Sequence, residues 1–357
     1  MAASATAAGS ITAEQGRAAW ARIAATADPA ADGTHEGRIA PSVAARLSEL
    51  ASPVLTDALL GGGLFDDATL TQSRLNNRFR LSAQRDCLRL IADAGVPVVV
   101  IKGFALAHMI YDDPEIRAVG DLDVLVRPVD RDRLVRHLHE NDYRFEPLPR
   151  PPWGFISTAS YAPFVSADDA CNLDVHIHPD CYPAYRSLTT EAVFARAVMI
   201  DADGLSFRAA CADHAFLLCA TNVAKDKFGL FAARKIADAM RLARRYDLDG
   251  PGLDRLAVDG GYAGPYRVFV RLLYDLGLRA GGLEMPVVDL SPPMAREYAR
   301  MLADTRRFYP DDPGLLATLR REILLSTELP VGAHNMWARV RGLFRNDDGV
   351  PDIPGLN

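Results

Sequence analysis

Two aspartates stand two positions apart in a short apolar segment of the chain. Asp121 and Asp123 alternate with aliphatic residues over positions 121–126. Because successive side chains of a β-strand point to opposite faces, both carboxylates would share one face of such a strand. Neighbouring carboxylates repel one another unless a cation lies between them, and Mg²⁺ is commonly held by one or two carboxylates together with substrate phosphates. The pattern therefore indicates a divalent-metal site, although two hydrated aspartates at a strand end would produce it too.

A third carboxylate lies on a later predicted strand. Residues 172–178 alternate in the same way, and Asp174 lies on the polar face. If the two strands pair, three carboxylates could hold two metal ions that clamp the attacking and leaving oxygens of a displacement at phosphorus. His176 and His178 share the face of Asp174 and are alternative zinc ligands, but no third nitrogen or sulfur ligand at suitable spacing accompanies them.

Upstream of the aspartate pair, Lys102-Gly103 joins a predicted strand at 96–101 to a predicted short helix at 104–111. Glycine lets the backbone approach a ligand closely, and a helix N-terminus favours anions. The junction predicts a triphosphate-binding turn, although a tight strand-to-helix turn alone would also require glycine.

Lysine is scarce in this arginine-rich chain. Among 40 basic residues, the lysines are Lys102, Lys225, Lys227 and Lys235. A compact ammonium suits contact with phosphate, so some of these lysines are candidates for that role. Chance survival of a few lysines in a strongly biased composition is the alternative.

Together these segments resemble a bacterial nucleotidyltransferase family, one branch of the DNA polymerase β-like superfamily, in which Lys-Gly replaces the superfamily's Gly-Ser turn. The segments that carry the resemblance are residues 100–106 (VIKGFAL), 111–114 (YDDP), Arg117, 120–126 (GDLDVLV) and 174–176 (DVH). It continues more loosely over 213–226 and 235–238, and so covers about 75–240. Related chains tend to carry histidines in the first helix after the core, where this sequence has Asn222 and Asp226.

The resemblance implies transfer of a nucleoside monophosphate from an NTP, with ATP as one candidate, to a hydroxyl or phosphate of an acceptor, with release of pyrophosphate. Mg²⁺ or Mn²⁺ would be the cofactor. Asp121 and Asp123 would bind both metal ions, and Asp174 would bind the catalytic ion and help to activate the acceptor. Gly103 would cradle the β- and γ-phosphates. The candidates for phosphate contact are Lys102, Gly103, Arg117 and Lys225, and Arg117 could instead pair with a nearby aspartate.

Three other functions compete with this interpretation. A glycosyltransferase would use Asp-x-Asp to hold Mn²⁺ on a nucleotide-sugar, but such folds usually place a longer α/β region ahead of the motif. A small-molecule kinase would show a His-x-Asp catalytic loop followed by Asn and a metal-binding Asp, a series that the sequence does not contain. A non-catalytic nucleotide-binding protein on the same scaffold is the third alternative.

The elements around these motifs predict an α+β fold with a small mixed-sheet, polymerase β-like core. Helices are expected at 41–60 and 66–94, the second with an apolar face formed by Leu75, Phe79, Leu81, Leu88 and Leu90. The predicted organisation is a mobile Ala-rich arm at 1–40, N-terminal helices at 41–95, the nucleotidyltransferase core at 96–210 and a helical C-terminal domain at 211–357. His214, near the start of a predicted helix, is expected to pack or cap rather than to catalyse.

Composition sets outer limits on function. With 357 residues, 49% hydrophobic and 24% charged, the chain predicts an ordinary globular protein. A net charge of −6 disfavours long nucleic acid as a partner and favours a small-molecule, peptide or protein acceptor. No apolar run of about 18 residues or secretory signal is evident. Five cysteines without CxxC spacing predict reduced thiols and a cytoplasmic location.

Overall fold

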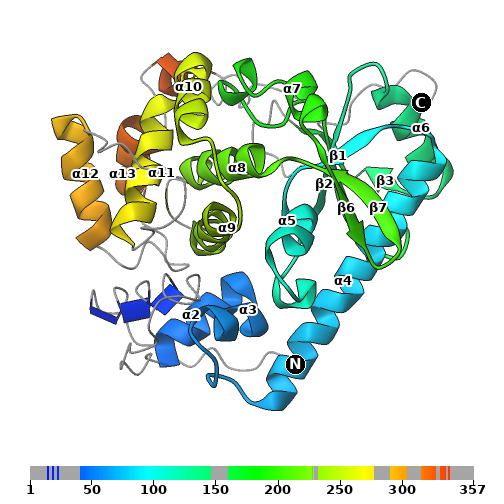
Figure 1. Ribbon diagram of the computed structural model, residues 1–357, viewed down its shortest axis with the longest axis horizontal. Coiled ribbons are helices and arrows are strands. Elements are labelled where there is room, and N and C mark those ends of the chain that lie inside the picture. The colour runs from blue at the N-terminus through cyan, green and yellow to red at the C-terminus, as the bar shows by residue number, and fades with distance from the viewer. Residues whose placement is uncertain are drawn as a thin grey trace.

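The computed structural model describes residues 14–15, 18–19, 22–23, 41–145, 160–226, 228, 232–276, 290–303, 315–326, 330–334 and 337. A mixed β-sheet lies on one side of the molecule and a group of helices lies on the other (Figure 1). The predicted α+β class, with helices before and after a mixed-sheet core, is confirmed.

The sheet contains seven strands among the described residues, in the order β3-β4-β5-β2-β1-β7-β6. In chain order they are β1 (Val98–Val100), β2 (Leu122–Val126), β3 (Arg144–Phe145), β4 (Ser160–Val165), β5 (Asn172–His176), β6 (Val198–Ala202) and β7 (Leu205–Ala209). The central strand β2 pairs antiparallel with β1 and parallel with β5. Every residue of β2 is buried, as expected for a strand covered on both faces.

The hairpin of β6 and β7 was not predicted. Its two strands meet at Asp203 and Gly204, which adopt φ values of 49° and 78°. Asp-Gly between two strand-forming runs is a strong hairpin signal, so the sequence did carry the information. The apolar residues of the first strand do not mark a buried face, because Val198 and Met199 are 37% and 58% exposed at the edge of the sheet. The short helix α7 (Thr190–Ala195) before the hairpin was also missed.

In the described stretch from residue 41 to β1, the helices are α2 (Pro41–Ala51), α3 (Pro53–Leu59) and α4 (Asp67–Asp93). The predicted single helix at 41–60 is interrupted at Ser52, whose φ is 77°. Ser52 caps the second helix, and Pro53 occupies its first turn, a position where the missing proline N–H costs nothing. Of the predicted arm at 1–40, Ala19 and Ile23 are buried in the core, and its other residues lie largely outside the described part.

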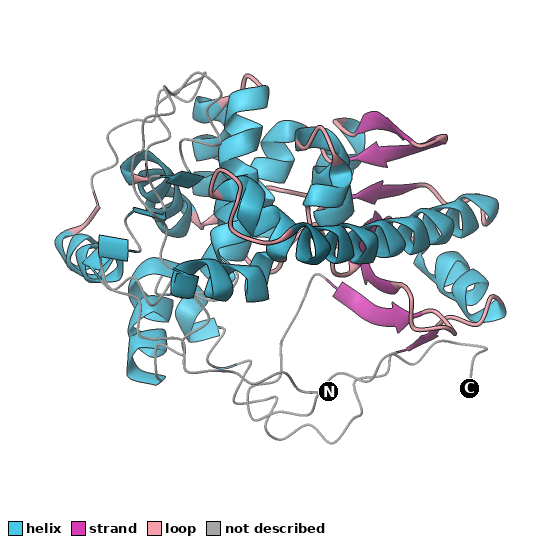
Figure 2. Cartoon of the chain, turned by 90° about the horizontal axis from the view of Figure 1, so that it is seen from below, coloured by secondary structure: helices cyan, strands magenta, loops and turns pink. Residues whose placement is uncertain are grey.

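The long helix α4 crosses the sheet (Figure 2), and its predicted apolar face is wrong over the first half. Leu75 and Phe79 are 49% and 62% exposed. The buried side instead carries Ser73, Asn77 and Gln84. Asn77 Nδ2 donates to the Glu115 carbonyl at 2.7 Å and Gln84 Nε2 to the Gly120 carbonyl at 2.8 Å. The helix thus uses amides to hold the backbone segment that leads into β2.

The remaining elements complete the two sides of the molecule. Within the core they are α5 (Gly103–Ile110), η1 (Pro114–Ile116), α6 (Arg131–Glu140) and η2 (Ala184–Arg186). After the core they are α8 (Ala212–Lys225), α9 (Ala232–Arg245), α10 (Gly250–Gly260), α11 (Ala263–Asp275), α12 (Pro292–Ala303), α13 (Leu315–Arg321) and the π-helical turn η4 (Glu322–Ser326). None of the helices in the described part of the chain has the length and apolarity needed to cross a membrane.

His214 in α8 predicts a pH dependence of stability. Its side chain is buried and its Nδ1 has no hydrogen-bond partner among the described residues. Burial, together with the charge of Arg196, lowers the pKa of His214 to about 4. Between pH 6.5 and about 4, the histidine is protonated in the unfolded state but largely neutral in the folded state. The free energy of unfolding should therefore fall as the pH drops from about 6.5 towards 4. The loss attributable to His214 is at most about 3 kcal/mol.

This contribution can be isolated by comparing urea denaturation of the wild type and His214→Phe at pH 7 and pH 4.5. We expect the variant to lose less stability on acidification than the wild type. The exposed His139 provides a control, since His139→Phe should leave the wild-type pH dependence unchanged. Equal acid sensitivity of His214→Phe and wild type would contradict the assignment.

Candidate active site

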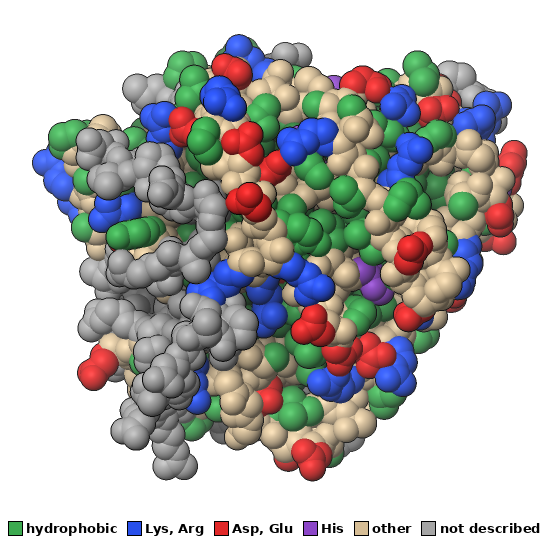
Figure 3. Space-filling model, in the orientation of Figure 1, with side chains coloured by type: hydrophobic (Ala, Val, Ile, Leu, Met, Phe, Trp, Pro, Cys, Tyr) green, Lys and Arg blue, Asp and Glu red, His purple; other side chains and the backbone are tan. Residues whose placement is uncertain are grey.

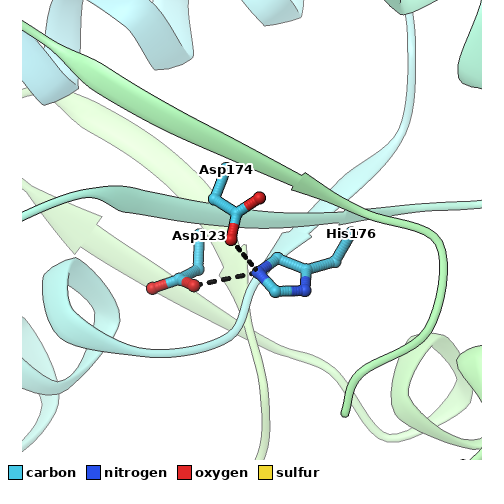
Figure 4. Close-up of side chains that lie close together, drawn as sticks. All are labelled: Asp123, Asp174 and His176. Atoms are coloured by element: carbon cyan, nitrogen blue, oxygen red, sulfur yellow. Dashed lines mark hydrogen bonds and ion pairs between the residues drawn. The ribbon is translucent and has the colours of Figure 1, made fainter. Parts of the chain in front are cut away.

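Two of the predicted carboxylates lie opposite one another at the centre of the sheet. The parallel register of β2 and β5 pairs Asp123 with Asp174 and Leu125 with His176. Because side chains alternate along each strand, both aspartates and the histidine share one face. Figure 4 shows the two carboxylates pointing from neighbouring strands towards the imidazole. The predicted pairing of these strands is therefore what brings the three side chains together.

The imidazole of His176 bridges the two carboxylates. Nε2 lies 2.9 Å from Oδ1 of Asp123 and 3.1 Å from Oδ2 of Asp174. One ligand atom from each of the three residues falls within 4.8 Å of the others. The cluster is therefore compact enough to hold a metal ion.

Lys102 adds a second cationic group to the cluster. Its Nζ donates to Oδ1 of Asp123 at 2.5 Å and lies 3.4 Å from Nε2 of His176. Burial alone would raise the pKa of Asp123, but the charge of Lys102 and the interactions with His176 outweigh burial and hold that pKa far below its ordinary value. Burial and the charge of Lys102 lower the pKa of His176, but the two carboxylates outweigh them and raise it above its ordinary value.

The donor set of the cluster fits a divalent cation, for which the carboxylates are the better ligands. The Nδ1 of His176 is buried and has no hydrogen-bond partner among the described residues. A metal-bound histidine almost always donates its other N–H to an acceptor, so the surroundings of Nδ1 favour a bracing role for His176. Two carboxylates offer the oxygen donors that Mg²⁺ and Mn²⁺ prefer.

Asp121 lies just before β2, at the mouth of a pocket that adjoins the cluster. Its side chain is exposed, and it lines the pocket together with Asp123 and Lys102. The nearby charge of Asp123 is the main cause that raises the pKa of Asp121 above its ordinary value. An added cation would relieve this repulsion, as expected for a carboxylate that shares a metal site.

Gly103 begins α5 and is backed by Arg117. A Cβ added at Gly103 would come within 3.3 Å of Nη1 of Arg117, so the close approach depends on glycine. Arg117 is 4% exposed and binds Asp238 through Nη2 to Oδ2 at 2.8 Å. Tyr111 donates to Oδ1 of the same carboxylate at 2.8 Å. Of the two roles predicted for Arg117, the structure shows the ion pair, while its side chain also lines the pocket.

The pocket has a volume of about 400 Å³ and lies between the sheet and α8 and α9. Apolar side chains of α5 and α8 form part of its wall, and charged side chains form the rest. Figure 3 shows basic side chains gathered near the middle of one face, with acidic side chains close by. The net acidic chain therefore still presents a local basic area.

A family model described as uncharacterised nucleotidyltransferase matches residues 25–274. The chain belongs to this family. No curated protein matches the chain, and no solved structure matches it. The matched stretch includes the whole cluster and all the described residues that line the pocket.

Lys225, another of the predicted phosphate ligands, pairs with a carboxylate and lies close enough to Lys102 for the two positive charges to repel. Its Nζ donates to Oδ1 of Asp180 at 2.5 Å, and Asp180 is 2% exposed. Burial alone would raise the pKa of Asp180, but the charge of Lys225 outweighs burial and lowers it. Lys225 is not among the described residues that line the pocket. Its contact with phosphate stays a prediction.

Several pocket residues were missed by sequence reasoning because they come from the helices after the core. Arg234 and Lys235 of α9 line the pocket, and Lys235 is ion-paired with Asp226. The scarcity of lysine was a signal for Lys235, whereas nothing distinguished Arg234 among many arginines. Asn222, at a position where histidine was expected from the resemblance, also lines the pocket. The helix α8 thus contributes to the wall despite this departure.

Proposed function

We propose that the protein transfers a nucleoside monophosphate from a metal-bound NTP, such as ATP, to a hydroxyl or phosphate of a small-molecule, peptide or protein acceptor. The observation that carries the proposal is the register of β2 and β5, which sets Asp123 beside Asp174 next to the Lys102-Gly103 turn. Family membership supports the reaction class. The net charge of −6 supports an acceptor other than long nucleic acid, and the buried thiols of Cys87, Cys171, Cys211 and Cys219 support a cytoplasmic location.

In the proposed reaction, the acceptor oxygen forms a bond to the α-phosphorus while the bond to the oxygen bridging the α- and β-phosphorus breaks. The electron pair of the broken bond leaves with pyrophosphate, and the acceptor proton passes to a base. Asp174, which is less buried than Asp123, is the carboxylate placed to orient the acceptor and receive that proton.

Asp121, Asp123 and Asp174 would hold the divalent metal, which supplies charge stabilisation at the reacting phosphate when bound. Lys102 balances the charge of the carboxylates and lies at the N-terminus of α5, where backbone N–H groups favour a phosphate. Glycine at position 103 avoids crowding against Arg117 where the turn enters α5, since an added Cβ would lie 3.3 Å from Nη1 of that arginine. His176 braces the two strand carboxylates through Nε2.

Thermal unfolding with each NTP, with and without Mg²⁺, tests this proposal. A ligand that binds only the folded protein raises the midpoint, and a concentration 100 times Kd adds about 2.7 kcal/mol of stability. We expect an Mg²⁺-dependent rise with at least one NTP in the wild type and none in Asp121→Asn/Asp123→Asn. Glu140→Gln, at an exposed site on α6, should keep the wild-type response.

The other outcomes separate the competing functions. A rise with a nucleotide-sugar but with no NTP would replace this proposal with a glycosyltransferase. An Mg²⁺-dependent rise with an NTP that survives in the double variant would remove the aspartates from the site. No rise with either class of ligand would refute nucleotide binding and with it the proposed reaction.

A further inference from the structure

A second pocket adjoins the first on the far side of the segment that leads into β2. It has a volume of about 680 Å³ and is bounded by α2, α3, α4 and residues 118–120. Gly120 and Arg234 line both pockets. A Cβ added at Gly120 would meet no heavy atom within 4 Å, so open space lies beside the backbone where the pockets meet. The two pockets therefore share a boundary at Gly120 and Arg234, and Gly120 adds no side chain between them.

Arg234 stands at the junction without a carboxylate partner among the described residues. The side chain is partly buried, and Nη1 donates to the Ala118 carbonyl at 3.4 Å. Its Nε is buried and makes no hydrogen bond within the described part of the protein. Burial, and then the charge of Arg117, lower the pKa of Arg234. Asp238 and Asp121 attract the guanidinium but neither forms an ion pair with it, and a guanidinium taken from water is unfavourable unless an anion completes its surroundings.

A second arginine approaches the same segment from α4. Nη1 of Arg80 donates to the Val119 carbonyl at 3.2 Å, one residue beyond the carbonyl that Arg234 contacts. Arg80 also forms no ion pair with a described carboxylate. Glu49 is the sole acidic residue among the described residues that line the second pocket, whereas Gln72, Ser73 and Asn76 contribute amide and hydroxyl groups. The second pocket is therefore rich in hydrogen-bond donors and poor in negative charge, whereas the aspartates lie on the side of the first pocket.

We propose that Arg234 and Arg80 form a phosphate subsite at this junction, which receives the pyrophosphate end of the NTP. This inference rests on the proposed function, because it assigns the direction in which the bound triphosphate extends from the metal site. Guanidinium groups bind phosphate oxygens through paired, charge-assisted hydrogen bonds. The phosphate chain would run from the Lys102-Gly103 turn past Gly120 to the two arginines. Free inorganic pyrophosphate carries the same phosphate groups as the end of the NTP, so it is the alternative ligand for this subsite.

Dissociation constants for ATP, AMP and inorganic pyrophosphate, each measured with Mg²⁺ by calorimetry, test the subsite. Charge-assisted hydrogen bonds contribute enough that Arg234→Gln should weaken ATP binding about tenfold or more. Arg80→Gln should weaken it in the same direction, and Arg234→Lys should lose less than Arg234→Gln. AMP binding should stay unchanged, because AMP lacks the pyrophosphate end. Arg80 is exposed, so its variant provides the test should Arg234→Gln fail to fold.

Arg133→Gln is the matched control, since Arg133 also donates to a backbone carbonyl, that of Gly95, but lies outside both pockets. Weaker binding of both ATP and pyrophosphate supports a subsite open to the free anion, and weaker binding of ATP alone supports one used only by the nucleotide. Unchanged ATP affinity in both glutamine variants, or an equal loss for AMP, would overturn the inference. A wild type that binds pyrophosphate through Arg234 but no NTP would instead overturn the proposed function and leave the anion site standing.

Discussion

Asp123→Asn is expected to lower the Mg²⁺-dependent release of pyrophosphate from NTP by about 10³-fold. Asp123 lies beside both Asp174 and the Lys102-Gly103 turn, so in the proposed function its charge would be needed to place the metal. Metal clamping of a reacting phosphate is worth several kcal/mol, and about 4 kcal/mol corresponds to this factor. The measurement is the initial rate of pyrophosphate release at saturating NTP and Mg²⁺, with water as the surrogate acceptor that takes up the nucleoside monophosphate.

The folded state should survive this substitution. Lys102 loses its closest partner, but Asp174 and Asp121 still attract its charge, and the amide of asparagine can still accept a hydrogen bond. Circular dichroism should therefore report a folded protein with a modestly lower unfolding midpoint. Glu140→Gln serves as the control for rate. A folded Asp123→Asn protein that retains wild-type turnover would refute the role of this carboxylate.

The largest loss of stability is expected at the buried ion pair behind Gly103. Arg117→Met should lower the free energy of unfolding by about 3–5 kcal/mol, because it leaves the carboxylate of Asp238 buried without its cation. Asp238 is 1% exposed. Of Arg117 and Tyr111, which both donate hydrogen bonds to its carboxylate, the variant would retain Tyr111. Urea denaturation of both proteins measures the difference.

A double-mutant cycle separates this loss from simple loss of packing. Asp238→Asn removes the charge while keeping the side-chain shape, so Arg117→Met/Asp238→Asn should be more stable than the sum of the two single effects by at least about 1 kcal/mol. Additive effects would show that the two residues are not energetically coupled. Arg117→Lys should be intermediate, because lysine keeps the charge but cannot bind both carboxylate oxygens in the arginine geometry.

The sequence predicts those parts of the site that depend on local alternation. Strand periodicity placed Asp123 and Asp174 on the polar faces of their strands, and the described pairing of β2 with β5 brings them together. The bridging position of His176 could not be predicted, because it depends on the register between strands about fifty residues apart. The same limit applies to Arg117, whose partner Asp238 lies on a helix 121 residues later in the chain.

The helix α4 shows why an apolar pattern can mislead. Leu75 and Phe79 suggested an inward face, yet the neighbouring amides are turned inward because the backbone before β2 needs hydrogen-bond partners. Lysine scarcity was informative in part. Lys102 and Lys235 line the first pocket, Lys225 pairs with Asp180, and Lys227 lies outside the described residues.

The position of β5 beside β2 also governs when the chain can acquire its site during folding. The two strands are parallel, and β3 and β4 lie between them in the chain. Parallel neighbours need a long crossover rather than a tight turn, so their pairing must wait until a large loop has closed. Non-local contacts of this kind form slowly compared with helices and hairpins. A nascent or truncated chain that ends before β5 contains Asp123 and Lys102 but lacks Asp174. Such a chain cannot assemble the pair of carboxylates.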